Sequence, residues 1–146
     1  MRLRTAFLVA LMPAAFSQAG PHFNVSAAYV PPASKGADGA VAVTFVALDP
    51  DVRVNEEPSP RLKLDPTQTV LVDKQKAAPS RGEAFDPEKA KYLDLAAPVL
   101  FSVAVSPDAP KGSQGVKATV TYFYCSKREG WCRKGTAPVD LALDVP

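Results

Sequence analysis

The sequence predicts an all-β fold, an antiparallel β-sandwich of seven to eight strands. Apolar residues recur with a period of two, which is typical of strands with one buried face. Proline and glycine clusters separate these segments, and 15 prolines among 146 residues exclude a long-helix or coiled-coil protein. Seven or eight such segments in about 127 residues is the number expected of an antiparallel sandwich.

The N-terminus has the pattern of a secretory signal peptide. Two arginines in the first five residues precede an apolar run of eleven residues, Ala6 to Phe16, which is too short for a membrane anchor. Ser17-Gln18-Ala19 then supplies small residues at the −1 and −3 positions of a cut before Gly20. We expect residues 1–19 to be removed and residues 20–146 to form one domain. The mature protein is expected to be periplasmic or secreted, without stable membrane insertion.

The strand candidates follow in chain order, separated by turn signals. The long alternating segments are Ala40 to Leu48, Val99 to Val105, Ala118 to Cys125, and Val139 to Val145, the last with the apolar-in, polar-out pattern of an edge or outer strand. Shorter candidates are Phe23 to Val30, Val52 to Val54, Arg61 to Leu64, and Thr69 to Val72. Turns are predicted at Pro31-Pro32, Gly36 to Gly39, Asp49 to Asp51, Ser106 to Asp108, and Gly112 to Gly115.

One short helix is predicted within a long polar connection. Asp86-Pro87-Glu88 supplies an N-cap, a proline at the first helical position and an acidic first turn, leading to Lys91. The connection from Asp73 to Lys91 is long enough to act as a flap or a covering loop. The sequence does not determine whether residues 73–91 cover the cysteines.

Charge and the single histidine exclude several classes of function. The chain carries 17 Lys and Arg against 15 Asp and Glu, and two arginines belong to the signal segment, so the mature chain is neutral. A neutral total argues against nucleic acid or an anionic membrane surface as a partner. His22 follows Pro21, which lacks the amide N–H that an N-terminal copper or nickel site uses. We expect a solvated terminus there, and neither a metal nor a cofactor.

The two cysteines are the strongest chemical signal. An even cysteine number in an exported chain predicts a disulfide, here between Cys125 and Cys132, with Gly130 allowing the turn between them. As a structural staple, this loop of about eight residues would stabilise the fold by roughly 2.5 kcal/mol. As a redox-active dithiol, the pair would benefit from nearby cations that favour the thiolate. The flanking cations are Lys127, Arg128, Arg133 and Lys134.

A family resemblance favours the redox interpretation. An aromatic run, Tyr122-Phe123-Tyr124, leads into Cys125, and a short loop then ends in Trp131 and Cys132. This arrangement resembles the N-terminal periplasmic domain of the thiol:disulfide interchange protein DsbD and related redoxin-associated domains. The segment from Asp51 to Asp65 looks similar to an early strand and proline-containing loop of that family.

The resemblance implies an immunoglobulin-like fold and a role in electron transfer. Cys125 and Cys132 would be the catalytic, exchanging pair of a protein-disulfide reductase-like activity, with the attacking cysteine left open. Tyr124 and Trp131 would be shielding or docking aromatics. The implied partners are other redox proteins acting in trans, either thioredoxin-like proteins or a membrane thiol reductase. The alternative from a different class is a non-catalytic extracytoplasmic binding or structural module with one structural disulfide.

Overall fold

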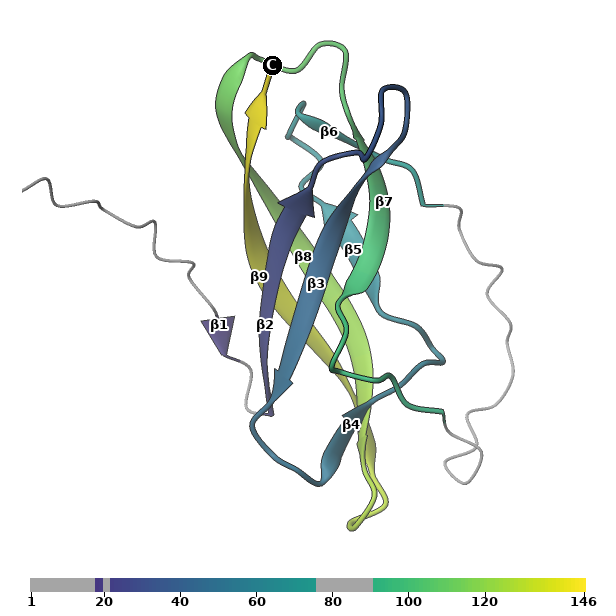
Figure 1. Cartoon of the computed structure of the whole chain (residues 1–146). Helices are drawn as coiled ribbons and strands as arrows, with labels where there is room; N and C mark the ends of the chain where they lie inside the picture. Colours follow the sequence, from purple (N-terminus) through teal and green to yellow (C-terminus); the bar gives the residue numbers. More distant parts are fainter. Residues whose placement is uncertain (1–17, 20–21, 76–90) are drawn as a thin grey trace, which may run out of the picture.

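The computed structural model describes residues 18–19, 22–75 and 91–146, which form strands and no helix (Figure 1). The predicted all-β class is therefore confirmed, and no helix among these residues is long and apolar enough to cross a membrane. The strands are β1 (Gln18–Ala19), β2 (Phe23–Val30), β3 (Gly39–Ala47), β4 (Val52–Val54), β5 (Arg61–Leu64), β6 (Leu71–Asp73), β7 (Val99–Val105), β8 (Gly112–Ser126) and β9 (Cys132–Val145).

The strands form two antiparallel sheets whose inner faces share one hydrophobic core. The first sheet has the strand order β1-β2-β3-β7-β6. In the second, the long strand β8 pairs with β9 along one side and with β4 and β5 along the other. Figure 1 shows the β8–β9 hairpin extending past the rest of the sheets at the end where β4 lies.

The faces predicted to be apolar are the buried ones. In β3, Val41, Val43 and Phe45 are buried, whereas Ala47 at the end of the strand is exposed. The same alternation continues through both long strands, as expected for strands with one face on the core. The buried side chains on this alternating face are Val116, Ala118, Val120, Tyr122 and Tyr124 on β8, and Ala137, Val139, Leu141, Leu143 and Val145 on β9. Cys125 and Ser126 at the end of β8 are buried as well. Within the described residues β9 pairs with β8 alone, so it is the edge strand that its pattern predicts.

The prediction of a turn at Gly112 to Gly115 is wrong, because these residues begin β8. Pairing with β9 runs without interruption from Gly112↔Val145 to Cys125↔Cys132. The hydrogen bonds of this long ladder outweigh the local preference of glycine for turns. For the same reason, β8 and β9 each extend well beyond the predicted segments.

The strand predicted from Thr69 begins two residues later, at Leu71. The side-chain oxygen of Gln68 accepts hydrogen bonds from the amides of Val70 (2.9 Å) and Leu71 (2.8 Å). Because the Gln68 side chain accepts from these two amides, they do not hydrogen-bond to a neighbouring strand, and β6 begins later than predicted.

Two further predictions concern the stretch 73–91 and the number of strands. The short helix predicted from Asp86 lies outside the described residues, as does most of the stretch 73–91. The described chain has nine strands rather than seven or eight, and β1 falls within the residues predicted to be cleaved. Its two residues pair with Asn24 and Val25 of β2. Cleavage after Ala19 stays a prediction.

Candidate functional site

The disulfide closes the tip of the β8–β9 hairpin, with a Cys125–Cys132 sulfur–sulfur distance of 2.05 Å and a Cα–Cα distance of 4.0 Å. The two residues are direct cross-strand partners. The next pair toward the tip is hydrogen-bonded, because the Ser126 amide donates to the Trp131 carbonyl at 2.9 Å. Non-hydrogen-bonded pairs alternate with such pairs and bring side chains closest together. The long ladder therefore places the two cysteines opposite each other for a bridge.

The two cysteines differ in their exposure to solvent. Cys125 is buried, with 2% of its surface exposed, whereas Cys132 at the start of the edge strand is exposed. Cys125 lies on the central strand, where β4 pairs alongside it through Arg53. Cys132 is therefore the cysteine more open to solvent, and Cys125 is the more protected.

A buried amide side chain contacts the protected sulfur. The Oδ1 atom of Asn55 lies 3.2 Å from the Cys125 Sγ atom, and Asn55 is only 1% exposed. Asn55 directly follows β4 and donates its backbone amide to the Phe123 carbonyl at 2.8 Å. Sequence reasoning missed this residue, because 70 positions separate it from Cys125 and no local pattern marks it.

The hairpin loop is fixed by an acidic residue from the β3–β4 connection. The Ser126 hydroxyl donates to Asp51 Oδ2, and the Arg128 amide donates to Asp51 Oδ1 at 3.0 Å. Within the loop, the Gly130 amide donates to the Ser126 carbonyl at 3.0 Å, and Gly130 has the positive φ of 72° that its turn was predicted to require. The Ser126 hydrogen bond is the main cause that lowers the pKa of Asp51 below its ordinary 3.8, helped by Arg128 and opposed by partial burial.

The four predicted cations gather around the hairpin but differ in what they contact. Lys127 Nζ lies 5.3 Å from the centroid of the Tyr92 ring, and the Arg133 guanidinium lies 4.2 Å from that of Trp131. Arg128 is 73% exposed and forms an ion pair with Asp51 at 3.9 Å. Lys134 extends from the same face of β9 as Cys132, two residues along the strand. Three of the four cations therefore engage an aromatic ring or a carboxylate, and their effect on the thiolates stays a prediction.

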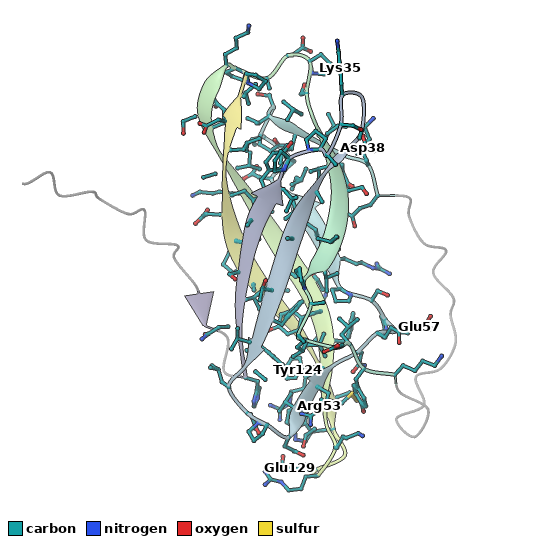
Figure 2. The ribbon with its side chains drawn as sticks, in the orientation of Figure 1. Lys35, Asp38, Arg53, Glu57, Tyr124 and Glu129 are labelled. Atoms are coloured by element: carbon teal, nitrogen blue, oxygen red, sulfur yellow. A yellow bond between two sulfur atoms is a disulfide. The ribbon has the colours of Figure 1, made fainter. Side chains whose placement is uncertain are left out.

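The predicted docking aromatics support the hairpin from the core side. Tyr124 is buried and contacts Phe23 (5.6 Å between ring centroids) and Trp131 (5.8 Å). Successive side chains of a strand point to opposite faces, so Tyr124 lies on the face of β8 opposite to Cys125. Figure 2 places Tyr124 and Arg53 near the hairpin tip marked by Glu129. A role for these aromatics in docking stays a prediction.

The prediction of a solvated terminus at His22 is wrong. Its side chain is only 20% exposed, and its ring lies 5.5 Å from that of Tyr124 and 5.6 Å from that of Trp131. The His22 carbonyl accepts a hydrogen bond from the Leu48 amide at 2.8 Å, which ties the residue before β2 to the end of β3. Aromatic packing thus covers a side chain that was expected to be solvated.

A small hollow of about 190 Å³ opens beside the exposed cysteine. Its lining residues are Tyr92, Ser126, Lys127, Gly130, Trp131 and Cys132. Tyr92 comes from the segment before β7 and is brought here by a bridge to Asn55, which sequence reasoning missed. A larger hollow of about 410 Å³ lies on the outside of the second sheet and contains neither cysteine. The hollow at Cys132 is therefore the one relevant to thiol chemistry.

The comparisons identify no relative of this chain. No family model, curated protein or solved structure matches it. The described residues contain no cluster of three or more His, Cys, Asp or Glu side chains that could hold a metal ion. What the arrangement can do chemically rests on the disulfide, its unequal exposure and the residues that surround it.

Proposed function

We propose that this protein is a periplasmic or secreted thiol–disulfide exchange module that relays electrons between protein partners through Cys125 and Cys132. The observation that carries the proposal is the unequal exposure of the two cysteines, one buried and one exposed beside a hollow. A purely structural bridge has no need of an accessible sulfur, whereas exchange requires one that a partner thiolate can reach.

The exposure assigns a role to each cysteine. A reduced partner's thiolate attacks Cys132 Sγ, the Cys125–Cys132 bond breaks, and Cys125 leaves and takes up a proton. The partner's second thiol then attacks the mixed disulfide, so the partner becomes oxidised and Cys132 is released as a thiol. Two electrons and two protons have moved to this protein. In the next exchange the Cys132 thiolate attacks a second partner's disulfide, and Cys125 resolves the mixed disulfide.

Contacts that do not involve the bridge also support this proposal. The loop is held by Asp51, and the core side of the hairpin is packed by Tyr124 and Trp131. The ladder of β8 and β9 continues for 14 residue pairs from the cysteines to Gly112. An exchanging pair needs such a scaffold, because the same geometry must persist in the oxidised and reduced states.

The proposal extends to fold family and partners. The two antiparallel sheets are compatible with an immunoglobulin-like sandwich of residues 20–146, and the aromatic run into Cys125 resembles the DsbD N-terminal domain. We propose thioredoxin-like proteins or a membrane thiol reductase as partners in trans. The signal-like N-terminus supports an oxidising compartment in which such a relay operates.

One observation favours the alternative, a non-catalytic binding or structural module with a structural disulfide. Lys127 and Arg133 lie over aromatic rings, and Arg128 is paired with Asp51, so these cations are engaged away from the sulfurs. Cations held in this way stabilise the hairpin whether or not the cysteines exchange.

The reduction potential separates the two functions. Equilibration with glutathione buffers is expected to give a value between about −120 and −270 mV, the range of exchanging pairs. Cys125→Ala, which leaves the exposed Cys132, is expected to accumulate a mixed disulfide with a thioredoxin-like probe protein, and Cys132→Ala is the matched control that does not. A potential below about −300 mV together with no trapped mixed disulfide would support the structural alternative instead.

A further inference from the structure

We propose that Asn55 is a positioning residue that sets the redox equilibrium of the disulfide by stabilising reduced Cys125. Its Oδ1 atom lies 3.2 Å from Cys125 Sγ, and both residues are almost completely buried, at 1% and 2% exposure. A buried polar atom aimed at one sulfur of a bridge acts differently on the oxidised and reduced states. This inference concerns the same cysteine pair as the proposed function and deepens it.

The backbone around Asn55 keeps its side chain against the sulfur. Its own amide donates to the Phe123 carbonyl at 2.8 Å, two residues before Cys125 on β8. On the other side it forms an antiparallel bridge with Tyr92, and the Leu93 amide donates to the Val54 carbonyl at 2.9 Å. Asn55 is thus held between β8 and the segment before β7. These backbone hydrogen bonds do not involve the disulfide, so we expect the short contact with Cys125 to remain after reduction.

The two redox states offer the Asn55 oxygen different partners. In the disulfide, Cys125 Sγ carries no hydrogen, so Oδ1 faces an atom that cannot donate. A buried acceptor without a donor costs free energy, and this cost falls on the oxidised state. Reduction converts the bridge and two glutathione thiols into two protein thiols and one glutathione disulfide. The new Cys125 S–H then donates to Oδ1, so the reduced state gains a hydrogen bond.

The same contact gives the two thiols of the reduced protein different chemical roles. An acceptor beside Cys125 stabilises its neutral thiol and disfavours its thiolate, whereas no side chain of the described residues hydrogen-bonds to the exposed Cys132. Asn55 therefore keeps the proton on the buried cysteine and leaves Cys132 as the nucleophile. A thiol is a weak donor, so we expect an effect of about tenfold on the dithiol–disulfide equilibrium constant, which is about 30 mV for a two-electron couple.

The test replaces the amide by an apolar side chain of similar volume. Asn55→Leu is expected to favour the disulfide about tenfold in equilibrium with glutathione, which lowers the reduction potential by about 30 mV. Glu56→Gln, the exposed neighbour, is the matched control and should leave the equilibrium constant unchanged. An equilibrium constant within twofold of the parent value, or a shift toward the dithiol, would overturn the inference.

A second measurement does not depend on the stability of the leucine variant. In Cys132→Ala, Cys125 is the one remaining thiol, and its S–H stretching band in the infrared is expected at the lowered frequency of a hydrogen-bonded thiol. A band at the frequency of a free thiol would contradict the proposed contact. The two proposals fail separately. A parent potential below about −300 mV with an intact Asn55→Leu shift would reject the exchange function and keep the role of Asn55.

Discussion

Removal of the bridge at its exposed end gives the most direct measure of how much the fold depends on it. In Cys132→Ala the lost side chain is exposed, so the cost is almost entirely that of the cross-link. The bridge closes a loop with a sequence separation of only 7, and the chain-entropy relation gives about 2.5 kcal/mol for a loop of this length. Asp51 and the aromatic contacts of Trp131 should keep the hairpin folded without it.

Cys125→Ala breaks the same bridge from its buried end. Besides the cross-link, this variant loses a sulfur that is 2% exposed, and the loss of one buried group of this size costs about 1 kcal/mol more. The two variants are therefore matched, and the difference between them isolates burial. We expect free energies of unfolding about 2.5 kcal/mol below the parent protein for Cys132→Ala and about 3.5 kcal/mol below it for Cys125→Ala.

Urea unfolding followed by circular dichroism measures both values, with a chemically reduced parent protein as a third sample. The reduced parent should resemble Cys132→Ala, because Cys125 keeps its place in the core. If Cys132→Ala costs more than about 4 kcal/mol or does not fold, the bridge is a structural staple and the proposed scaffold reasoning is refuted. If both variants cost the same, the difference in burial has no energetic consequence.

Three further outcomes follow from the structure. In the reduced protein, a short iodoacetamide pulse should label Cys132 before Cys125, because Cys125 is buried. Mass spectrometry measures the order of labelling, and the opposite order would contradict the roles proposed for the two cysteines. Gly135→Ala should lower the free energy of unfolding by about 1–3 kcal/mol, because the added Cβ would lie 2.6 Å from Tyr122 Cζ. Gly115→Ala on the paired strand is the control, because its added Cβ would meet no atom within 4 Å. The pKa of Asp51 is lowered in the folded state, mainly by the hydrogen bond from the Ser126 hydroxyl. Ionised Asp51 therefore stabilises the hairpin fully above the ordinary pKa of 3.8, and this stabilisation is lost as the pH falls through the folded-state pKa. The NMR chemical shift of the Arg128 amide, which donates to Asp51, should change with pH over this range. If the same pH dependence persists in Asp51→Asn, another group causes it and the prediction is contradicted.

Much of the fold could be predicted from the sequence because a strand with one buried face leaves a period of two in the chain. The bounds of β2, β4, β5 and β7 agree with the predicted segments to the residue, and the apolar face predicted for Val139 to Val145 of β9 is buried. The errors arose where a longer-range interaction outweighed a local preference. Glycines that favour a turn begin β8, because a partner strand supplies hydrogen bonds to the whole segment.

The sequence by itself determined the all-β class, the alternation of buried side chains and the cysteine pair at the end of a hairpin. All three depend on residue types and spacings that are read along one chain. The tertiary structure alone decided that Cys125 is covered and Cys132 is open, that Asn55 faces the buried sulfur, and that His22 packs beneath the hairpin. These facts depend on which distant segment covers each face of a strand. A periodic pattern indicates which face of a strand is buried, but it does not indicate which distant residues pack against that face.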